Sequence, residues 1–236
     1  MASSRLPGKV LLPLADKPAL ERLIERLKRS KYLDGIVVAT TDKPGDDAIE
    51  ALARQLGVVC FRGSEDDVLG RVLGAAQSVQ ADLICEITGD CPLLDWRVVD
   101  RGIEEFFAEP LDYAANCLSQ SYPLGFETQV FPTKVLAEVD QLTQDPIDRT
   151  HVSYYIYMHP ERYRFKNWTA NAEAHAPDMR VTLDEAEDLK LIDLVFRELL
   201  PTKPDFSAED VVTLLKQKPE WLAINEHVRQ KQAQEG

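Results

Sequence analysis

The sequence predicts an α/β protein with a single doubly wound, mostly parallel sheet and a small α+β excursion at about residues 120–170. Short apolar runs suited to buried strands alternate with amphipathic helical stretches through the first half of the chain. The 236 residues can bury a sizeable core, and no internal repeat or long Pro/Gly/Ser linker divides them. We therefore expect one domain that spans residues 1–236.

The first half of the chain is expected to alternate helix and strand. Residues 18–30 have apolar side chains at helical spacing, with Pro18 at an early position of the helix. The apolar run at 35–41 is a buried strand. The elements that follow are a helix at 46–56, a strand at 58–61, a helix at 65–80 and a strand at 83–87. This order is typical of a parallel sheet with helices on both faces.

After a helix at 98–107 and a strand at 113–117 the alternation breaks, which is why we expect an excursion there. A short strand, two helices and an edge strand follow, at 127–131, 134–141, 148–159 and 165–168. A strand at 179–183 then leads into the last helices, expected at 189–199, 207–216 and 219–230.

The composition excludes several classes of function. A formal net charge of -13 argues against a nucleic-acid binder, because affinity for a phosphate backbone comes mainly from clustered Lys and Arg. The four cysteines form no CxxC pair, which favours buried thiols in a reducing compartment. No run of 18 apolar residues and no signal peptide is present. We expect a cytoplasmic protein without nucleic-acid or membrane partners.

Two aspartates are the main candidates for a functional site. Asp90 and Asp184 each follow an apolar strand by a few residues, so both are expected at the edge of the sheet where ligands bind in α/β folds. Two carboxylates together with phosphate oxygens suit Mg²⁺. Asp90 is equally well explained as a turn or helix cap, and the acidic run 184–188 suits the first turn of a helix.

The first nine residues combine small residues, one Gly, one Pro and the cations Arg5 and Lys9. Such a loop can approach an anion, although it is not a Walker A motif, and a mobile basic terminus is the more common meaning of such residues. Together with the two aspartates, however, these cations indicate nucleotidyl transfer, in which metal and cations stabilise charge on the α-phosphate and on departing pyrophosphate.

Six motifs in the right order also resemble one family. They are S-S-R-L-P-G-K-V-L-L-P-L at 3–14, A-T-T-D at 39–42, F-R-G-S-E-D-D-V-L at 61–69, I-T-G-D-C-P-L-L-D at 87–95, R-T-H-V at 149–152 and T-L-D-E-A-E-D-L at 182–189. They resemble the cytidylyltransferases that activate acidic sugars as CMP-sugars, above all the spore-coat polysaccharide type, and cover about the first 200 residues. Relatives include the CMP-Kdo and CMP-sialate synthetases, so the resemblance implies the fold of nucleotide-diphospho-sugar transferases, the GT-A type.

The resemblance implies a role for each matching residue. Arg5, Lys9 and Asp90 would be catalytic, and Asp90 and Asp184 would bind Mg²⁺. CTP and an acidic sugar would be the substrates. The aromatic region 154–168 would pack a homodimer, as in relatives, or cover one end of the core, which is the default interpretation. The nucleotide would be bound by Ser3, Ser4, Arg5, Lys9, Thr40, Asp42, Arg62 and Thr88, and the sugar by Glu127, Arg149 and His151.

Three departures from the family pattern are visible. Family members normally begin with a central strand and Gln-Ala-Arg before the methionine that aligns with Met1, so we expect the first strand to be missing. Thr88 stands where several relatives have Gln. Gln129 and Thr150 stand where acidic residues are usual, which suggests an altered sugar specificity. Two alternatives stay open at this point: a glycosyltransferase that uses a nucleotide sugar, and a non-catalytic truncated homologue that acts as a binding partner.

Overall fold

The structure is a computed structural model of the whole chain, and it describes residues 5–230. The strands are β1 (Pro13–Leu14), β2 (Lys17–Pro18), β3 (Val37–Thr41), β4 (Val59–Gly63), β5 (Leu83–Glu86), β6 (Tyr113–Ala115), β7 (Gln129–Pro132) and β8 (Phe165–Asn167). The helices are η1 (Lys9–Leu11), α1 (Ala19–Leu27), η2 (Pro44–Asp46), α2 (Asp47–Gln55), α3 (Val68–Ser78), α4 (Trp96–Ala108), α5 (Thr133–Leu142), α6 (Pro146–Thr150), α7 (Tyr154–Met158), α8 (Ala186–Leu199), α9 (Ala208–Gln217) and α10 (Pro219–Leu222). The α/β class is confirmed.

The expected single, mostly parallel sheet is not what the described residues form. Their strands fall into three sheets: the hairpin β1–β2, the parallel pair β3–β4, and a mixed sheet in the order β5-β7-β6-β8. The mixed sheet arises because the chain returns from the excursion and places β7 antiparallel to both β5 and β6. Within residues 5–230, β3 and β5 are each paired along one edge.

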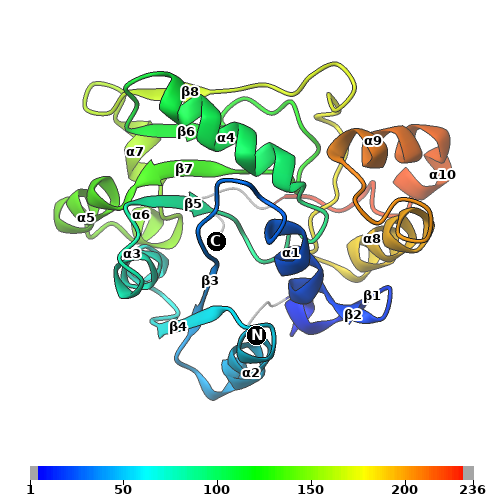
Figure 1. Cartoon of the computed structure of the whole chain (residues 1–236), viewed down its shortest axis with the longest axis horizontal. Coiled ribbons are helices and arrows are strands. Elements are labelled where there is room, and N and C mark those ends of the chain that lie inside the picture. The colour runs from blue at the N-terminus through cyan, green and yellow to red at the C-terminus, as the bar shows by residue number, and fades with distance from the viewer. Residues whose placement is uncertain (1–4, 231–236) are drawn as a thin grey trace.

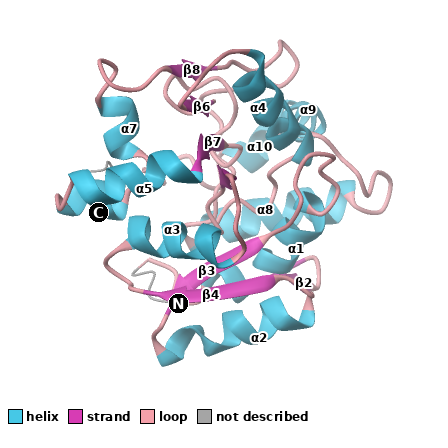
Figure 2. Ribbon diagram, turned by 60° about the vertical axis from the view of Figure 1, so that its left-hand side comes forward, coloured by secondary structure: helices cyan, strands magenta, loops and turns pink. Residues whose placement is uncertain are grey.

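Helices cover these sheets in separate groups. Figure 1 shows α4 in front of β6 and β7, with α8, α9 and α10 grouped on one side and α3, α5, α6 and α7 on the other. The β3–β4 pair lies between α2 and α3, which both contact it (Figure 2). Among the described residues, no helix is both long enough and apolar enough to cross a membrane.

Three of the expected elements differ in the structure. The helix expected at 148–159 is broken into α6 and α7 by a turn in which Val152 has a φ of 50°. Residues 179–183 form an isolated parallel bridge, between Leu124 and Arg180, rather than a strand. The last expected helix is short, since α10 ends at Leu222. In each case a tertiary contact or a local turn overrides the periodic pattern of the sequence.

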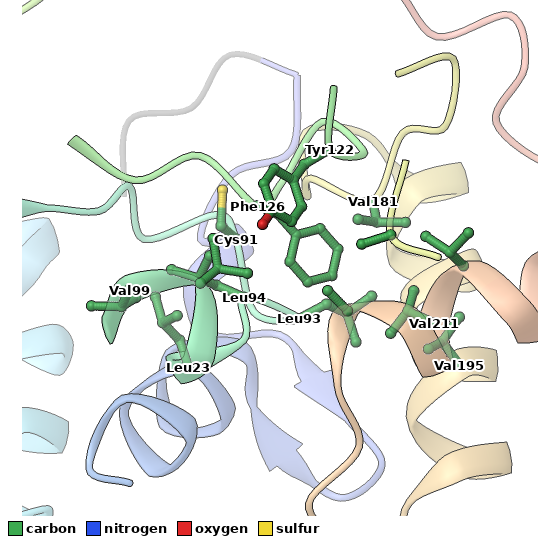
Figure 3. Packing of buried hydrophobic residues seen from close by; sticks show 14 of the residues in the cluster. Leu23, Cys91, Leu93, Leu94, Val99, Tyr122, Phe126, Val181, Val195 and Val211 are labelled. Atoms are coloured by element: carbon green, nitrogen blue, oxygen red, sulfur yellow. The ribbon is translucent and has the colours of Figure 1, made fainter. Parts of the chain in front are cut away.

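The main core lies between α4, α8 and α9, directly behind the loop that follows β5. Leu93 and Leu94 of that loop are fully buried and belong to the same cluster as Phe126. Figure 3 shows Phe126 among Leu93, Val181 and Val211, so segments far apart in the sequence meet here. Burying a side chain of this size contributes roughly 1.5–3 kcal/mol. The loop that contains Asp90 is therefore anchored by the residues that follow it.

Gly125 allows its loop to approach closely the segment that precedes Asp184. Its φ is 115°, and a Cβ atom there would lie 2.8 Å from the amide nitrogen of Thr182 and 2.8 Å from the carbonyl carbon of Val181. Next to it, the Leu124 amide donates to the Met179 carbonyl at 2.9 Å, and the Val181 amide donates to the Leu124 carbonyl at 2.7 Å. This contact fixes the backbone that leads to Asp184.

We expect Gly125→Ala to lower the free energy of unfolding by more than about 2 kcal/mol, because the new methyl group meets backbone atoms and the φ is strained for an L-residue. Urea unfolding monitored by circular dichroism measures the loss. Gly35→Ala is the matched control, since a Cβ at Gly35 meets nothing within 4 Å. Equal unfolding midpoints for the two variants would show that the close approach at Gly125 is unimportant.

Candidate active site

A compact cluster of charges brings together the residues predicted from the two ends of the chain. The Lys9 ammonium lies 2.6 Å from Asp90 Oδ2 and 2.8 Å from Asp184 Oδ1. Arg5 adds a contact of 2.9 Å to the same oxygen of Asp184. The structure thus brings four of the predicted site residues, Arg5, Lys9, Asp90 and Asp184, into one place. Ser3 and Ser4, predicted to bind the nucleotide, lie outside the described residues.

Arg180 and Asp188 hold Asp184 on the side that faces away from Lys9. Arg180 donates to Asp184 Oδ2 at 2.6 Å and to Asp188 Oδ1 at 3.0 Å. Asp188 is fully buried, and its carboxylate also accepts from the backbone amides of Asp184 and Glu185, both at 2.9 Å. Asn225 donates to Asp188 at 2.8 Å. A buried carboxylate is stable only with such complete pairing.

The start of α8 explains why the acidic run 184–188 has two roles. Glu185 is the N-cap and Asp188 the third helical residue, and together they form a capping box. The capping interpretation is therefore right for these two residues. Asp184 lies before the cap and faces Lys9 instead. Its neighbour Leu183 donates to the Asp90 carbonyl at 2.8 Å, which fixes the two aspartate segments side by side.

The electrostatics of the cluster favour full ionisation. Burial lowers the pKa of Lys9, but the charge of Asp90 and the hydrogen bonds to both aspartates outweigh it and raise the pKa above its usual value. Burial likewise raises the pKa of Asp184, but Lys9, Arg180 and Arg5 overcome this effect and hold it below the usual range. Both carboxylate and ammonium are charged at neutral pH.

The cluster has the chemistry of a hard-cation site that uses few protein ligands. Within the described residues, no group of three or more His, Cys, Asp or Glu side chains is arranged to hold a metal ion. Asp90 Oδ2 and Asp184 Oδ1 nevertheless converge on one cation, the Lys9 ammonium. Two carboxylate oxygens with room for substrate phosphates are what Mg²⁺ commonly uses.

The other predicted nucleotide residues lie at the ends of β3 and β4. Thr40 is buried and donates to Asp46 at 2.6 Å, while Asp42 is exposed. Arg62 binds Glu50 at 2.6 Å and Asp47 at 3.0 Å, so its guanidinium is already paired within this layer. The structure gathers these three residues near one another, but it places no direct contact between them and the charge cluster.

Thr88 connects the cluster to a cavity. Its hydroxyl lies 3.2 Å from Cys91 Sγ, next to Asp90, and its side chain lines a cavity of about 610 Å³. Cavities of this size hold small-molecule ligands. The polar residues that line it include Glu86, Thr88, Gln129, Thr150, His151 and Ser153.

Of the three predicted sugar-binding residues, only His151 lines this cavity. Arg149 forms two hydrogen bonds to Asp67, at 2.8 and 2.5 Å, and a 2.8 Å ion pair to Asp140, so it joins α3, α5 and α6 rather than lining the cavity. Glu127 accepts from the Gly125 amide at 2.7 Å and is likewise absent from the lining. Spacing in the sequence does not reveal such long-range ion pairs.

The cavity contains a polar network that the sequence reasoning missed. Gln129 of β7 is paired in register with Glu86 of β5 and donates to Glu86 Oε2 at 3.3 Å. Gln129 Oε1 accepts from the hydroxyls of Tyr113, at 2.5 Å, and Ser153, at 2.6 Å. Burial raises the pKa of Glu86 to about 8. A signal was present, since a carboxylate inside the apolar run L-I-C-E-I is unusual.

Cations and carboxylates that converge beside a cavity in an α/β fold suit a nucleotidyltransferase. The comparison with known sequences makes this specific. A sequence model described as "Cytidylyltransferase" matches residues 1–218, and this chain belongs to that family. This family membership argues against the alternative of a glycosyltransferase that uses a nucleotide sugar. It identifies the protein as an enzyme of the nucleotidyltransferase class.

Several relatives show how far the similarity extends. The spore coat polysaccharide biosynthesis protein SpsF of Bacillus subtilis is 34% identical, over 93% of this chain and 92% of its own length. The solved structure of a cytidylyltransferase from Leptospira borgpetersenii has a TM-score of 0.88 at 32% identity, covering 94% and 92% of the two chains. A 3-deoxy-manno-octulosonate cytidylyltransferase of Chlorobium luteolum is 30% identical over 82% of this chain and 80% of its own length. An 8-amino-3,8-dideoxy-manno-octulosonate cytidylyltransferase of Shewanella frigidimarina is 27% identical over 81% and 82%.

The raised pKa of Glu86 predicts a pH dependence of stability. The folded protein keeps a proton on Glu86 up to about pH 8, whereas the unfolded chain releases it near 4.5, so the free energy of unfolding falls as the pH rises between these values. Glu86→Gln lacks this dependence. Its stability relative to the wild type should therefore increase by more than about 1 kcal/mol between pH 5.5 and pH 8.5.

Urea unfolding at the two pH values measures this difference, with Glu198→Gln, a half-exposed glutamate, as the control. A difference between Glu86→Gln and the wild type that is the same at both pH values would contradict the raised pKa.

Proposed function

We propose that the protein is a Mg²⁺-dependent cytidylyltransferase that transfers CMP from CTP to a hydroxyl of an acidic sugar and releases pyrophosphate. The observation that carries the proposal is the convergence of Asp90 and Asp184 on one cation, with Lys9 and Arg5 beside them. The names of the relatives support CTP as the nucleotide and 3-deoxy-manno-octulosonate or a related sugar acid as the acceptor.

In this proposal Asp90 and Asp184 would hold the magnesium ion. When bound, Mg²⁺ would supply positive charge to the phosphate oxygens and favour ionisation of the attacking hydroxyl. The two carboxylates fit this role because they come from separate, well-anchored segments and already share one cation. Arg180 and Asp188 orient Asp184 from its other side, as outer residues of metal sites commonly do.

Lys9 and Arg5 are proposed to bind the triphosphate. Both side chains are partly exposed, with 16% and 24% of their surface accessible, so they can exchange carboxylate partners for phosphate oxygens. Removing Lys9 from between the aspartates leaves two carboxylates that repel each other, and a divalent cation compensates for this repulsion. Positioning and charge stabilisation of this kind account for most of the catalysis of phosphoryl transfer.

The cavity beside Thr88 is the proposed acceptor site. It lies next to the loop that carries Asp90, and its volume of about 610 Å³ suits a monosaccharide. We propose that His151, in its wall, binds the carboxylate of the sugar. The similarity to a spore coat polysaccharide protein supports a role in making a surface polysaccharide. Assembly as a homodimer and a cytoplasmic location stay predictions.

The direct test is release of pyrophosphate with each of the four nucleoside triphosphates, Mg²⁺ and a panel of acidic sugars. We expect release with CTP and one class of acceptor, and none after EDTA. Release with CTP in the absence of any acceptor would indicate hydrolysis, which contradicts a transferase. No release with any combination would favour the alternative of a non-catalytic binding partner.

We expect Asp90→Asn to lower kcat at least ~1000-fold, because it removes one of the two charges proposed to hold the metal. Its unfolding midpoint should stay close to that of the wild type, since Asp90 is partly exposed and Lys9 keeps its contact with Asp184. Asp16→Asn is the control, because the Asp16 side chain is 92% exposed and outside the cluster. Full activity in Asp90→Asn would remove the metal assignment.

A further inference from the structure

The cavity beside Thr88 has an unusual charge inventory for a site that receives a sugar acid. Among the described residues that line it, none is Lys or Arg, and Glu86 is the one carboxylate. Gln129 and Thr150 both lie in its wall and are uncharged. Glu86 is therefore the one carboxyl group of the described lining, and it carries negative charge only when it is ionised.

The orientation of Gln129 is fixed by two donors. Its amide oxygen accepts from Tyr113, which is fully buried, and from Ser153, so its nitrogen must point toward Glu86. This places an NH₂ group 3.3 Å from Glu86 Oε2, a long hydrogen bond. Gln129 consequently holds the Glu86 carboxyl in position without neutralising it.

The Glu86 carboxyl has acceptor capacity left over. Within residues 5–230 the contact with Gln129 is the one hydrogen bond that its side chain makes. An ionised carboxylate offers about four lone-pair sites, and a buried one is costly without an opposite charge. Burial raises the pKa of Glu86 to about 8, which agrees with a carboxyl that lacks a compensating cation. The groups whose pKa values the charge of Glu86 raises, which include Tyr113, Tyr157 and Cys117, are neutral acids and supply no cation.

We propose that Glu86 binds an amino group of the acceptor and makes the enzyme select amino sugars over their hydroxyl counterparts. This inference rests on the proposed function. An ammonium brings three donors and the missing positive charge, whereas a hydroxyl brings one donor and no charge. A carboxylate brings neither a donor nor a positive charge, so it cannot compensate an ionised Glu86.

Glu86 is the last residue of β5, and Asp90 follows four residues later, so the two carboxylates are at most ~13 Å apart along the chain. A probe of the proposal must carry an amino group in addition to its acid group. The substrate named for the Shewanella relative, 8-amino-3,8-dideoxy-manno-octulosonate, meets this requirement.

The test is calorimetric binding of two matched sugars, 8-amino-3,8-dideoxy-manno-octulosonate and 3-deoxy-manno-octulosonate, to the full chain without CTP. We expect the wild type to bind the amino sugar at least ~10-fold more tightly. Glu86→Gln, which keeps the shape of the side chain, should remove this preference and leave affinity for the hydroxyl sugar within about twofold. Glu198→Gln should bind both sugars as the wild type does.

Equal or weaker binding of the amino sugar by the wild type overturns the proposal, as does failure of both sugars to bind. These two outcomes are measured on the wild type alone, so they test the proposal even if Glu86→Gln does not fold. A preference that survives in folded Glu86→Gln also overturns it. Pyrophosphate release with CTP and Mg²⁺ separates the two proposals. If the wild type prefers the amino sugar in binding but releases no pyrophosphate, only the proposed cytidylyl transfer is refuted. If the wild type and Glu86→Gln release pyrophosphate equally with both sugars, only the proposed role of Glu86 is refuted.

Discussion

The shared contact of Lys9 with Asp90 and Asp184 is the interaction on which the rest of the site depends. Two carboxylates brought from distant parts of the chain into a partly buried place repel each other unless a cation lies between them. Arg180 supplies further positive charge on the other side of Asp184. This balance of charge joins the N-terminal loop, the loop after β5 and the start of α8 into one unit.

Packing and hydrogen bonding behind the cluster make that balance rigid. Leu93 and Leu94 bury the loop after β5 in the main core (Figure 3). The capping box of Glu185 and Asp188 fixes the start of α8. Asp188 joins the two parts, because the same carboxylate caps the helix and receives Arg180. A catalytic arrangement held within a few tenths of an ångström needs support of this kind.

The sequence reveals those features that depend on local periodicity or on strand ends. Helices such as α1 follow from their apolar spacing. The meeting of Asp90 with Asp184 was expected from two apolar runs, although residues 179–183 form an isolated bridge rather than a strand. The antiparallel insertion of β7 and the pairing of Arg149 with Asp67 depend on contacts between distant residues, which no local pattern encodes. The break at Val152 was equally hidden, because a β-branched residue rarely has a positive φ.

The cavity and the charge cluster are built from different stretches of the chain. The cluster uses Lys9, Asp90 and Asp184, whereas most of the cavity wall comes from residues after β6, including the turn between α6 and α7. That turn lies outside both helices and contributes no residue to the cluster. Under the proposed function the fold is modular: a lineage can exchange one acceptor for another through substitutions in the cavity wall, while the charge cluster proposed to bind the nucleotide is inherited unchanged.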